Sequence, residues 1–502
     1  MTGAEEPAPR AMRRPPAGVS IALALGLAGT VAMYALAEDA RRDAERAAAQ
    51  RQAVLDFVTR DILGQADPYR NPHATAALPL IEAVERAAAG IDAAVADPAS
   101  AAAVHALVAA VFFAHDRHAD AIAQYERARE IYRSLDAPPA AELVAVETGL
   151  CDVHRIAGAL AAAEDACQAA HARAAATGAA RDVATLKLGQ LRGEQGRDEE
   201  SLALLRPLLA ADAFAGEPRL RGELHWAMGL SERGLGRYAA ARRHFEALLA
   251  QQPGDGVPGT WTAWAYNSLG SVQASIGDYD AAEATLLEAR RIFAATQGTG
   301  QVEAQMPNIW RGEIRLRRGE WAEAAAMQQA LLEAWAPALG PEHPLWLKAQ
   351  ANLAWARAEA GQRREARAAL DEALAARAKV LDPSGTAVAV RAIRWTRAAQ
   401  ALGADAEAAQ LLGIVDAALA REYPGAHPVR AEAECLHARQ ALAAGGRDAA
   451  LARAKACATM LSDFVDERHP LAVEARALVA RADALRPVRR ESARSPAARS
   501  GP

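Results

Sequence analysis

The sequence has few aromatic residues, few cysteines and no excess of basic side chains. Aromatic residues make up 5% of the 502 residues, and four cysteines are present. So few cysteines in a chain of this length exclude a disulfide-rich scaffold. Lysine and arginine total 57 against 62 aspartate and glutamate residues, and the net charge is −5. A dedicated nucleic-acid-binding protein is therefore not expected.

What the sequence has in abundance is alanine. Hydrophobic residues make up 52% of the chain, and alanine is the commonest of them. Because alanine is the best helix former and a poor strand former, this composition predicts a nearly all-helical fold. At about 150 residues per domain the length corresponds to roughly three domains, unless the chain is an array of repeats.

An uncharged segment lies near the N-terminus, at residues 19–37. At a rise of 1.5 Å per residue it spans about 28 Å, which is the thickness of a bilayer core. We expect a single membrane helix in the bacterial inner membrane, with residues 1–18 in the cytoplasm and the C-terminal domain in the periplasm. Two alternatives stay open: cleavage after Ala37, which would release a periplasmic protein, and a hydrophobic helix of a cytosolic protein.

Small residues recur every four positions within this segment, at Ala22, Gly26 and Thr30. A stripe of this kind lets two membrane helices pack closely, so it suggests a homodimer. Residues 38–98 are expected to form juxtamembrane helices. At the other end, residues 485–502 are rich in arginine, proline and serine, and we expect them to be disordered.

A repeated pattern occupies most of the chain. A small residue is followed seven positions later by a glycine, and an alanine follows five positions after that, as in Gly229, Gly236 and Ala241. Successive copies recur at a nearly constant spacing of about 40 residues, which is typical of helical-repeat arrays. The last small residue of each copy is Ala121, Ala163, Ser201, Ala241, Ala282, Ala324, Ala366, Ala408 or Ala450.

The pattern predicts a helical hairpin in each copy. A small residue such as Gly270 allows the second helix to cross closely, and the next glycine forms the turn. We expect the second helix to place its own small residue, such as Ala282, opposite the first one, and a larger residue, such as Leu286, four positions further on. One hairpin cannot bury its apolar face, but stacked hairpins form a continuous core. We therefore expect an all-α protein: a right-handed α-solenoid of about nine hairpins over residues 99–484, preceded by one transmembrane helix.

At these positions the chain resembles the tetratricopeptide repeat family, whose usual unit has about 34 residues and the pattern W-x2-L-G-x2-Y…A-x3-F…P. The longer unit of this chain, about 42 residues in most copies, is similar to that of kinesin light chains. This resemblance implies a superhelix that binds an extended peptide or a protein along its concave surface.

The order of the segments resembles a second group of proteins. A membrane helix, residues 57–72, residues 80–98 and then repeats are similar to part of the bacterial one-component regulators that carry a winged-helix domain. The same order is similar to that of repeat-bearing bacterial Ser/Thr kinases. The stretch before the apolar segment, residues 1–18, is too short for the effector domain of either group. We expect neither direct DNA binding nor phosphoryl transfer.

The family register predicts which residues line the concave groove. These are Gln190, Trp226, Arg233, Trp264, Asn267, Glu313, Lys348, Trp355, Arg397 and Gln400. Three of them are tryptophans, which either anchor a peptide or fill the interface between repeats.

The four cysteines fall into two pairs with the same antiparallel register in their repeats. Cys151 and Cys167 form one pair, and Cys435 and Cys457 form the other. We treat both pairs as candidate disulfides, and the alternative is that all four are small buried hydrophobic residues. His154 and His171 accompany the first pair, but they would lie about 10 Å apart along the hairpin. A zinc site is therefore not predicted.

Three His-Pro pairs, beginning at His343, His427 and His469, recur at one repeat position. They lie on separate units, so we interpret them as the starts of helices rather than as metal ligands. No catalytic motif is present, and no catalytic residue, cofactor or metal is predicted.

The sequence thus predicts a membrane-anchored protein-interaction module, an envelope sensor or scaffold that binds a protein or an exposed peptide. One alternative is the sensor component of a transcriptional or signalling regulator whose effector is a separate chain. A second alternative is a cleaved, soluble periplasmic binding protein.

Overall fold

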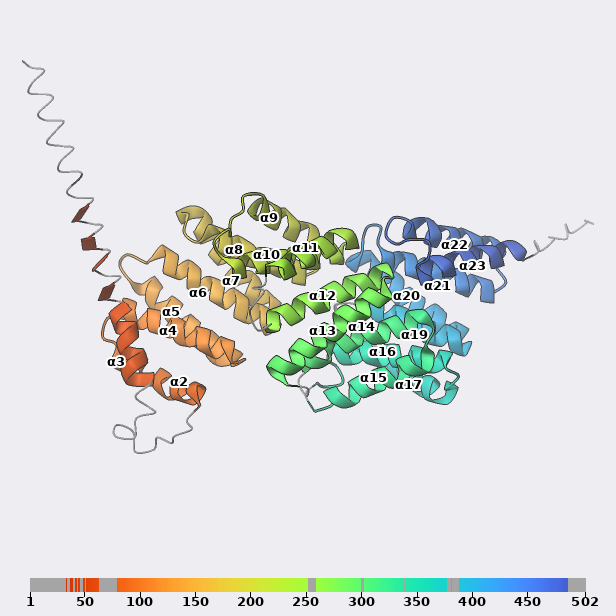
Figure 1. The fold of residues 1–502 in the computed structure, drawn as a ribbon, viewed down its shortest axis with the longest axis horizontal. Helices are drawn as coiled ribbons and strands as arrows, with labels where there is room; N and C mark the ends of the chain where they lie inside the picture. The colour runs from red at the N-terminus through yellow and green to blue at the C-terminus, as the bar shows by residue number, and fades with distance from the viewer. Residues whose placement is uncertain are drawn as a thin grey trace, which may run out of the picture. The chain divides into compact units, whose positions relative to one another are not determined.

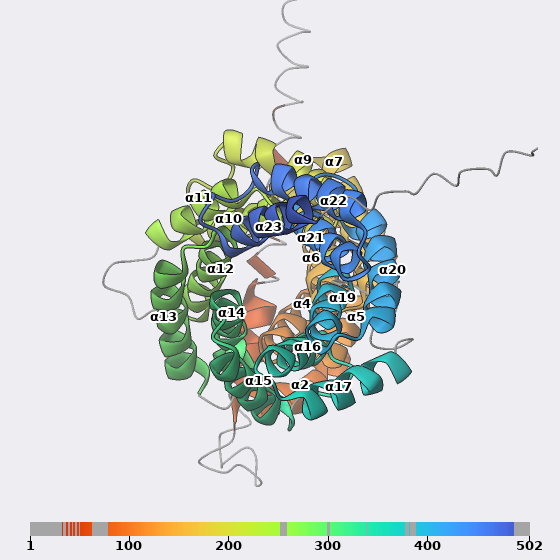
Figure 2. The same ribbon diagram turned by 90° about the vertical axis from the view of Figure 1, so that its right-hand side faces the viewer.

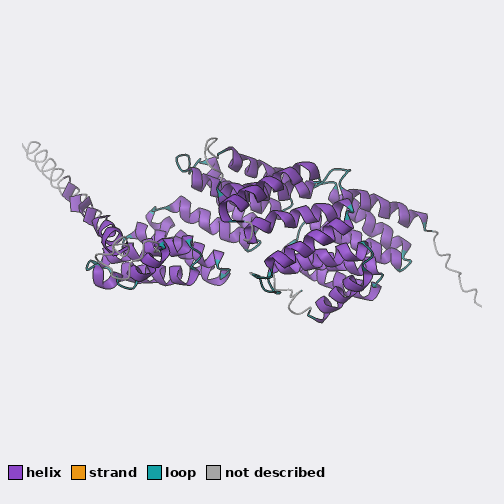
Figure 3. Ribbon diagram, turned by 60° about the horizontal axis from the view of Figure 1, so that its bottom comes forward, coloured by secondary structure: helices purple, strands orange, loops and turns teal. Residues whose placement is uncertain are grey.

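A computed structural model describes residues 51–62, 79–251, 259–298, 302–337, 339–376, 381 and 388–485, with single residues between 33 and 49. Every regular element in these ranges is a helix, and the described residues contain no strand (Figure 3). The predicted all-α class is confirmed. The chain divides between Ala184 and Thr185 into two compact units, called unit 1 and unit 2 below.

Unit 1 contains two complete hairpins and the helices that precede them (Figure 1). Helix α4 packs against α5, α5 against α6, and α6 against α7. The η1 element is a short π-helix and packs against α2. The elements are η1 (Phe57–Ile62), α2 (Leu80–Ala88), α3 (Ile91–Ala94), α4 (Pro98–Ala114), α5 (His118–Ser134), α6 (Ala140–Ile156) and α7 (Leu160–Thr177).

Unit 2 continues the same hairpin pattern and ends on a single helix. The boundary between the units falls within α8 (Arg181–Glu194), which is followed by its hairpin partner α9 (Asp198–Ala210). The later elements are α10 (Pro218–Gly234), α11 (Tyr238–Ala250), α12 (Thr260–Ile276), α13 (Tyr279–Gln297), α14 (Val302–Arg318), α15 (Trp321–Trp335), α16 (Pro344–Glu359), α17 (Arg363–Ala375), α19 (Val388–Leu402), α20 (Asp405–Glu422), α21 (Pro428–Ala443), α22 (Arg447–Leu461) and α23 (Pro470–Ala484).

The register of the repeat is visible in the burial of its small residues. All nine residues of the aligned series, from Ala121 to Ala450, have an exposed fraction of 0%. Eight hairpin turns contain a glycine with positive φ, between 68° and 92°. In the first hairpin Asp116 takes this conformation with φ 58°. Side chains other than glycine rarely adopt such angles, so the sequence pattern marks the turns directly.

Small residues on the first helix of a hairpin let the second helix come close. A Cβ atom placed on Gly270 would lie 2.6 Å from Cγ of Leu286, and one on Gly229 would lie 2.7 Å from Cε1 of Phe245. The larger residue of the second helix, rather than its small residue as predicted, therefore lies directly against the glycine in these hairpins. Interiors this dense leave no room for an added methyl group without movement of a neighbour.

The three His-Pro pairs begin α16, α21 and α23. In each case the histidine is the N-cap: Nδ1 of His343, His427 and His469 accepts a hydrogen bond from the backbone N–H two residues later. The proline follows in the first turn, where its missing N–H costs nothing.

All four cysteines are buried within two hairpins. Cys151 of α6 is bonded to Cys167 of α7, with their Cα atoms 4.9 Å apart. Cys435 of α21 is bonded to Cys457 of α22, with a Cα separation of 5.4 Å. In the described ranges no group of three or more His, Cys, Asp or Glu side chains could hold a metal ion.

The expectation of a membrane helix needs correction. The stripe Ala22, Gly26 and Thr30, and all but a few residues of 19–37, lie outside the described residues, as do residues 1–18 and 486–502. Among the residues that are described, no helix is long and apolar enough to cross a membrane. This finding contradicts the predicted inner-membrane localisation.

Two glycine-to-alanine substitutions test the close approach of the helices. Gly270→Ala should lower stability by about 1–3 kcal/mol, because its methyl group meets Leu286. Gly413→Ala should raise stability by about 0.5–1 kcal/mol, because Gly413 lies within helix α20 with no other group within 4 Å of its added Cβ. Thermal unfolding followed by circular dichroism measures both. If both variants changed the stability by the same amount, the assigned register of the hairpins would be contradicted.

The two cysteine pairs make a further prediction. After refolding in an oxidising glutathione buffer and denaturation, no cysteine should react with iodoacetamide, and reduction should expose all four. The double variant Cys435→Ser, Cys457→Ser should be less stable than the oxidised chain by about 3 kcal/mol, because the bond limits the freedom of the unfolded loop. Mass spectrometry counts the alkylated residues. Alkylation of either pair before reduction would refute that bond.

Candidate functional site

The helices of unit 2 form an inner and an outer layer. Figure 2 shows the first helices of the hairpins, α10, α12, α14, α16, α19 and α21, on the inside, and their partners α11, α13, α15, α17, α20 and α22 on the outside. The first helices therefore carry most of the side chains that face the interior of unit 2. This is the surface on which the sequence predicted a groove.

Repeats far apart in the sequence meet across this interior. The turn at Gly236, between α10 and α11, lies against His427, Pro428 and Phe464. The next turn, at Gly277, lies against the ring of His469. The helix starts that carry the second and third His-Pro pairs thus pack onto turns near the beginning of unit 2. Unit 2 closes on itself in this way.

A cavity of about 410 Å³ lies inside the closed part of unit 2. Most of its lining residues belong to α10, α12, α14, α16, α19, α21 and α23 or to the residues that flank these helices. Its charged lining residues are Arg233, Glu313, Arg317, Lys348, Arg391, Arg394 and Glu432, and its aromatic ones include Tyr238, Tyr279, Trp310 and Tyr423. The volume is within the range of small-molecule and peptide-side-chain pockets.

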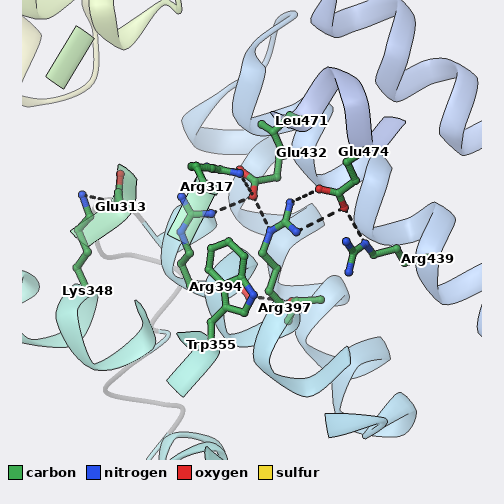
Figure 4. A network of polar contacts seen from close by, with 12 residues as sticks. Glu313, Arg317, Lys348, Trp355, Arg394, Arg397, Glu432, Arg439, Leu471 and Glu474 are labelled. Atoms are coloured by element: carbon green, nitrogen blue, oxygen red, sulfur yellow. Dashed lines mark hydrogen bonds and ion pairs between the residues drawn. The ribbon is translucent and has the colours of Figure 1, made fainter. Parts of the chain in front are cut away.

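The carboxylate of Glu432 is the centre of a buried ion network beside this cavity (Figure 4). Its Oε1 accepts hydrogen bonds from Nη1 of Arg394 at 3.0 Å and from Nε of Arg397 at 2.7 Å. Its Oε2 accepts one from Nη2 of Arg317 at 2.8 Å. Only 4% of Glu432 is exposed. The pair of Arg317 and Glu432 joins helices α14 and α21, and its two members are separated by 115 residues.

The charges in this network stabilise one another. Burial alone would raise the pKa of Glu432, but attraction to Arg317, Arg394 and Arg397 outweighs it and holds the pKa well below its usual value. Glu474 of α23 extends the network by accepting from Nη2 of Arg397 at 3.2 Å. Its ion pair with Arg439 has a separation of 2.7 Å, and the two arginines lower its pKa despite burial. Both carboxylates are therefore ionised at neutral pH.

A second polar group lies on α14 and α16. Nζ of Lys348 is 3.1 Å from Oε1 of Glu313, and 4.2 Å from the centroid of the Trp310 ring. The guanidinium of Arg233, from α10, lies over the same ring at 5.8 Å. Trp310 thus has two cations beside it, which is a favourable arrangement for an indole ring.

The histidines of the cavity contribute no positive charge at neutral pH. Burial lowers the pKa of His427 to about 4, and it does the same for His469. Burial also raises the pKa of Tyr238 and of Tyr279 to about 12, so both phenols keep their protons. The charge of the cavity at neutral pH is therefore set by its arginines, its lysine and its two glutamates.

The structure brings together half of the residues that the sequence predicted for the groove. Arg233, Glu313 and Lys348 line the cavity. Arg397 lies beside it in the network of Glu432, and its guanidinium is over the ring of Trp355 at 4.9 Å. Trp355 is only 3% exposed, so it supports this arginine and presents no open surface to a ligand.

The other five predicted residues lie outside the cavity. Gln190 and Asn267 are buried. Nε2 of Gln400 donates to the carbonyl oxygen of Leu436 at 3.0 Å, which links α19 to α21. Trp226 packs edge-on against Trp261, and Trp264 packs edge-on against Phe293. Trp226 thus contacts the first helix of the next hairpin, and Trp264 contacts the second helix of its own hairpin.

Several residues of the cavity were missed from the sequence. Glu432 is one of them, although it occupies the same repeat position as Lys348, two units further along the chain. Trp310 and Arg394 are likewise two units apart and share another inner position. Extending the register to the ninth unit would have found Glu432. Arg317 and the two histidines carry no such signal, because their role depends on closure between distant repeats.

Comparison with known proteins identifies the repeats in the part of the chain that builds this site. The tetratricopeptide repeat model matches residues 220–295 and 303–379, which correspond to α10–α13 and α14–α17. The chain therefore contains tetratricopeptide repeats. The predicted longer variant of the repeat and the likeness to winged-helix regulators or kinases are not confirmed by this match. No curated protein matches the sequence.

Several solved structures resemble this chain to different degrees. The apo form of the quorum sensor NprR from B. thuringiensis has a TM-score of 0.52 at 11% identity, over 74% of this chain and 98% of that one. A Rap protein complexed with competence and sporulation factor gives 0.46 at 11% identity, over 68% and 98%. A putative kinesin light chain of Podospora anserina gives 0.31 at 24% identity, over 40% and 95%. Of these three structures, NprR alone has a TM-score above 0.5, and its similarity to this chain is one of fold.

Removing the charge of Glu432 tests the network. Glu432→Gln should destabilise unit 2 by about 3–5 kcal/mol, because three buried guanidinium groups lose their shared carboxylate. The control is Glu434→Gln, which breaks a surface pair with Arg453 and should cost less than about 1 kcal/mol. Chemical denaturation compares the two. A similar, small effect of both variants would show that the network does not hold the structure together.

Proposed function

We propose that unit 2 binds a peptide, or an extended segment of a partner protein, in its interior cavity. The observation that carries the proposal is the closure of unit 2 around this space, because closure places polar and aromatic side chains of helices between α10 and α23 around one volume. A site that converges in this way can fix both the position and the orientation of a ligand.

The composition of the lining supports a binding role. Arginine, tyrosine and tryptophan are the residue types that contribute most to recognition of peptides and proteins. Arg233, Tyr279 and Trp310 lie together here, on α10, α13 and α14. Because the rigid ion network of Glu432 supports one side of the cavity, little ordering of the protein is needed when a ligand binds.

The comparisons support the same proposal. Tetratricopeptide repeats bind peptides and proteins on the inner helices of their superhelix, and the matched repeats supply the helices α10, α12, α14 and α16 of the cavity. NprR, whose fold is similar, is a quorum sensor. By analogy we propose that this chain is the sensor component of a regulator whose effector is a separate chain.

A sensor needs a structural element that responds to its ligand. The ion pair between Arg317 and Glu432 fills this role in the proposal, since both residues line the cavity and join repeats that are distant in the sequence. A ligand that contacts either residue would change the free energy of closure, and closure would present a different outer surface to the effector.

Filling the cavity tests the proposed function. Purified protein is mixed with a random octapeptide pool, separated by size exclusion, and the retained peptides are identified by mass spectrometry. Ala274→Trp, which places an indole at the cavity wall, should abolish retention. The matched control Ala284→Trp lies on the exposed face of α13 and should retain the same peptides as the natural sequence.

A thermal unfolding curve for each variant shows that the fold is intact, and a rise in melting temperature with the retained pool gives an independent measure of binding. Retention that is the same in Ala274→Trp and Ala284→Trp would place the binding site elsewhere. Absence of retention in the natural sequence would contradict the proposal itself.

A further inference from the structure

Two histidines make contacts between repeats that are distant in the sequence. A Cβ atom placed on Gly236 would lie 3.2 Å from Cδ2 of His427, and one on Gly277 would lie 3.0 Å from Cδ2 of His469. Each histidine has an exposed fraction of 6%. The two rings are therefore buried where helix starts late in unit 2 meet turns near its beginning.

Both rings also cap their helices, and this bond requires an unprotonated Nδ1. Nδ1 of His427 accepts a hydrogen bond from the N–H of Val429 at 3.1 Å, and Nδ1 of His469 accepts one from the N–H of Leu471 at 3.2 Å. A protonated imidazole has a hydrogen on each nitrogen and accepts no hydrogen bond. It would also place a positive charge at the positive end of the helix dipole. Protonation therefore removes the cap and buries a charge in the same place.

The surroundings of His427 favour the neutral ring. The ring stacks on that of Tyr423 with a centroid distance of 4.2 Å, and the ring of Phe464 lies at 6.4 Å. Burial is the main cause that lowers the pKa of His427 to about 4; Arg430 lowers it further, and the backbone of Gly234 raises it. Burial also raises the pKa of Tyr423, so this neighbour is an uncharged phenol. The neutral imidazole is the form that fits this contact.

The ring of His469 lies beside the ion network of Glu432. Burial and repulsion from Arg317 lower the pKa of His469 to about 4, although Glu432 and Asp466 attract the charged form. Because its arginines hold the pKa of Glu432 well below the usual value, this carboxylate keeps its charge in mild acid. The histidine is therefore the member of this group that changes its charge there.

One carboxylate close to the closure titrates in the same pH range with the opposite sign. The carboxylate of Asp198 lies directly against Gly234. Burial raises the pKa of Asp198 to about 6, despite a hydrogen bond with Ser231 and attraction to Arg233. A group whose pKa is raised on folding binds its proton more tightly in the folded chain, so its protonation stabilises the fold as the pH falls. Asp198 thus opposes the effect of the two histidines.

We propose that His427 and His469 form a pH-sensitive switch: their protonation in mild acid releases the starts of α21 and α23 from the turns at Gly236 and Gly277 and opens the interior of unit 2. In the open form the rings reach water, and their pKa returns to the ordinary value of 6.5. Closing therefore expels a proton from each ring. Closure is fully favoured above pH 6.5 and is lost progressively as the pH falls from 6.5 towards 4.

The size of the effect follows from the pKa of each ring in the two forms. Between pH 7 and pH 5, each histidine should shift the equilibrium between the closed and open forms about 10- to 20-fold towards the open form. The two histidines together should shift it on the order of 100-fold. The switch needs no ligand, so it stands or falls independently of the proposed function.

The distance between two nitroxide labels placed across the closure measures the switch. The labels are attached to Ala239→Cys, on α11 beside the turn at Gly236, and to Ser462→Cys, at the end of α22; both positions are exposed. Electron paramagnetic resonance should show one short distance at pH 7 and a second, longer distance that grows as the pH falls to 5. Circular dichroism at both pH values shows that the helices stay folded.

Replacement of the histidines shows whether their rings are responsible. The double variant His427→Asn, His469→Asn removes both titrating rings and keeps a side-chain acceptor at each N-cap. Its ratio of open to closed form should change at least about 10-fold less between pH 7 and pH 5 than in the natural sequence. The matched control His343→Asn makes the same change at a capping histidine in the middle of the array and should respond as the natural sequence does. Asp198 is present in every variant, so its contribution cancels.

An unchanged distance between pH 7 and pH 5 in the natural sequence would overturn the switch. So would an equal pH response of the double variant and the His343→Asn control. If the double variant is open at both pH values, the natural sequence decides, because NMR of 13C-labelled histidine follows the protonation of both rings directly. Opening that follows the protonation of His427 and His469 supports the switch, and opening while either ring is still neutral overturns it.

Discussion

The carboxylate of Glu432, shared by three arginines from two other helices, is the interaction on which the interior of unit 2 depends. It joins α21 to both α14 and α19, and so it connects repeats that are not neighbours in the array. The helix starts at His427 and His469 make further contacts across the same closure. Together these contacts hold early and late repeats of unit 2 around one space.

Closure changes the physics of a helical-repeat array. In an open solenoid each repeat contacts only its neighbours, so stability is a sum of local terms. In unit 2 the turns at Gly236 and Gly277 also contact helix starts near the end of the array. The energy of the last repeats is thereby coupled to that of the first, and a ligand in the cavity can act on both. A charged centre suits this role, because its partners must be present together for the burial to be favourable.

Much of the local structure could be predicted from the sequence. The hairpin register follows from small residues such as Ala241, because a fully buried position at a helix crossing admits little else. The hairpin turns could be predicted because most of them contain a glycine, which adopts a positive φ without strain. The His-Pro pairs mark the starts of helices. Part of the cavity followed as well: Arg233, Glu313 and Lys348 were placed on the inner surface because each occupies an inward position of its first helix.

The remainder depends on contacts between distant repeats, which a local pattern does not encode. Neither Arg317 nor His427 differs locally from a surface arginine or an ordinary N-cap, and their burial follows only from closure. Trp226 and Trp264 were ambiguous because a large aromatic side chain suits both a groove and an interface, and here they pack between helices. The membrane prediction rested on hydropathy alone, and no helix in the described ranges supports it.

A double-mutant cycle between Arg317 and Glu432 tests the central claim most directly. The free energy of unfolding is measured for the natural sequence, Arg317→Met, Glu432→Met and the double variant. Closure predicts a coupling energy of about 1.5 kcal/mol or more between these residues, which are 115 positions apart. Additive effects, with no coupling energy, would mean that the repeats of unit 2 form an open array, and would contradict the account.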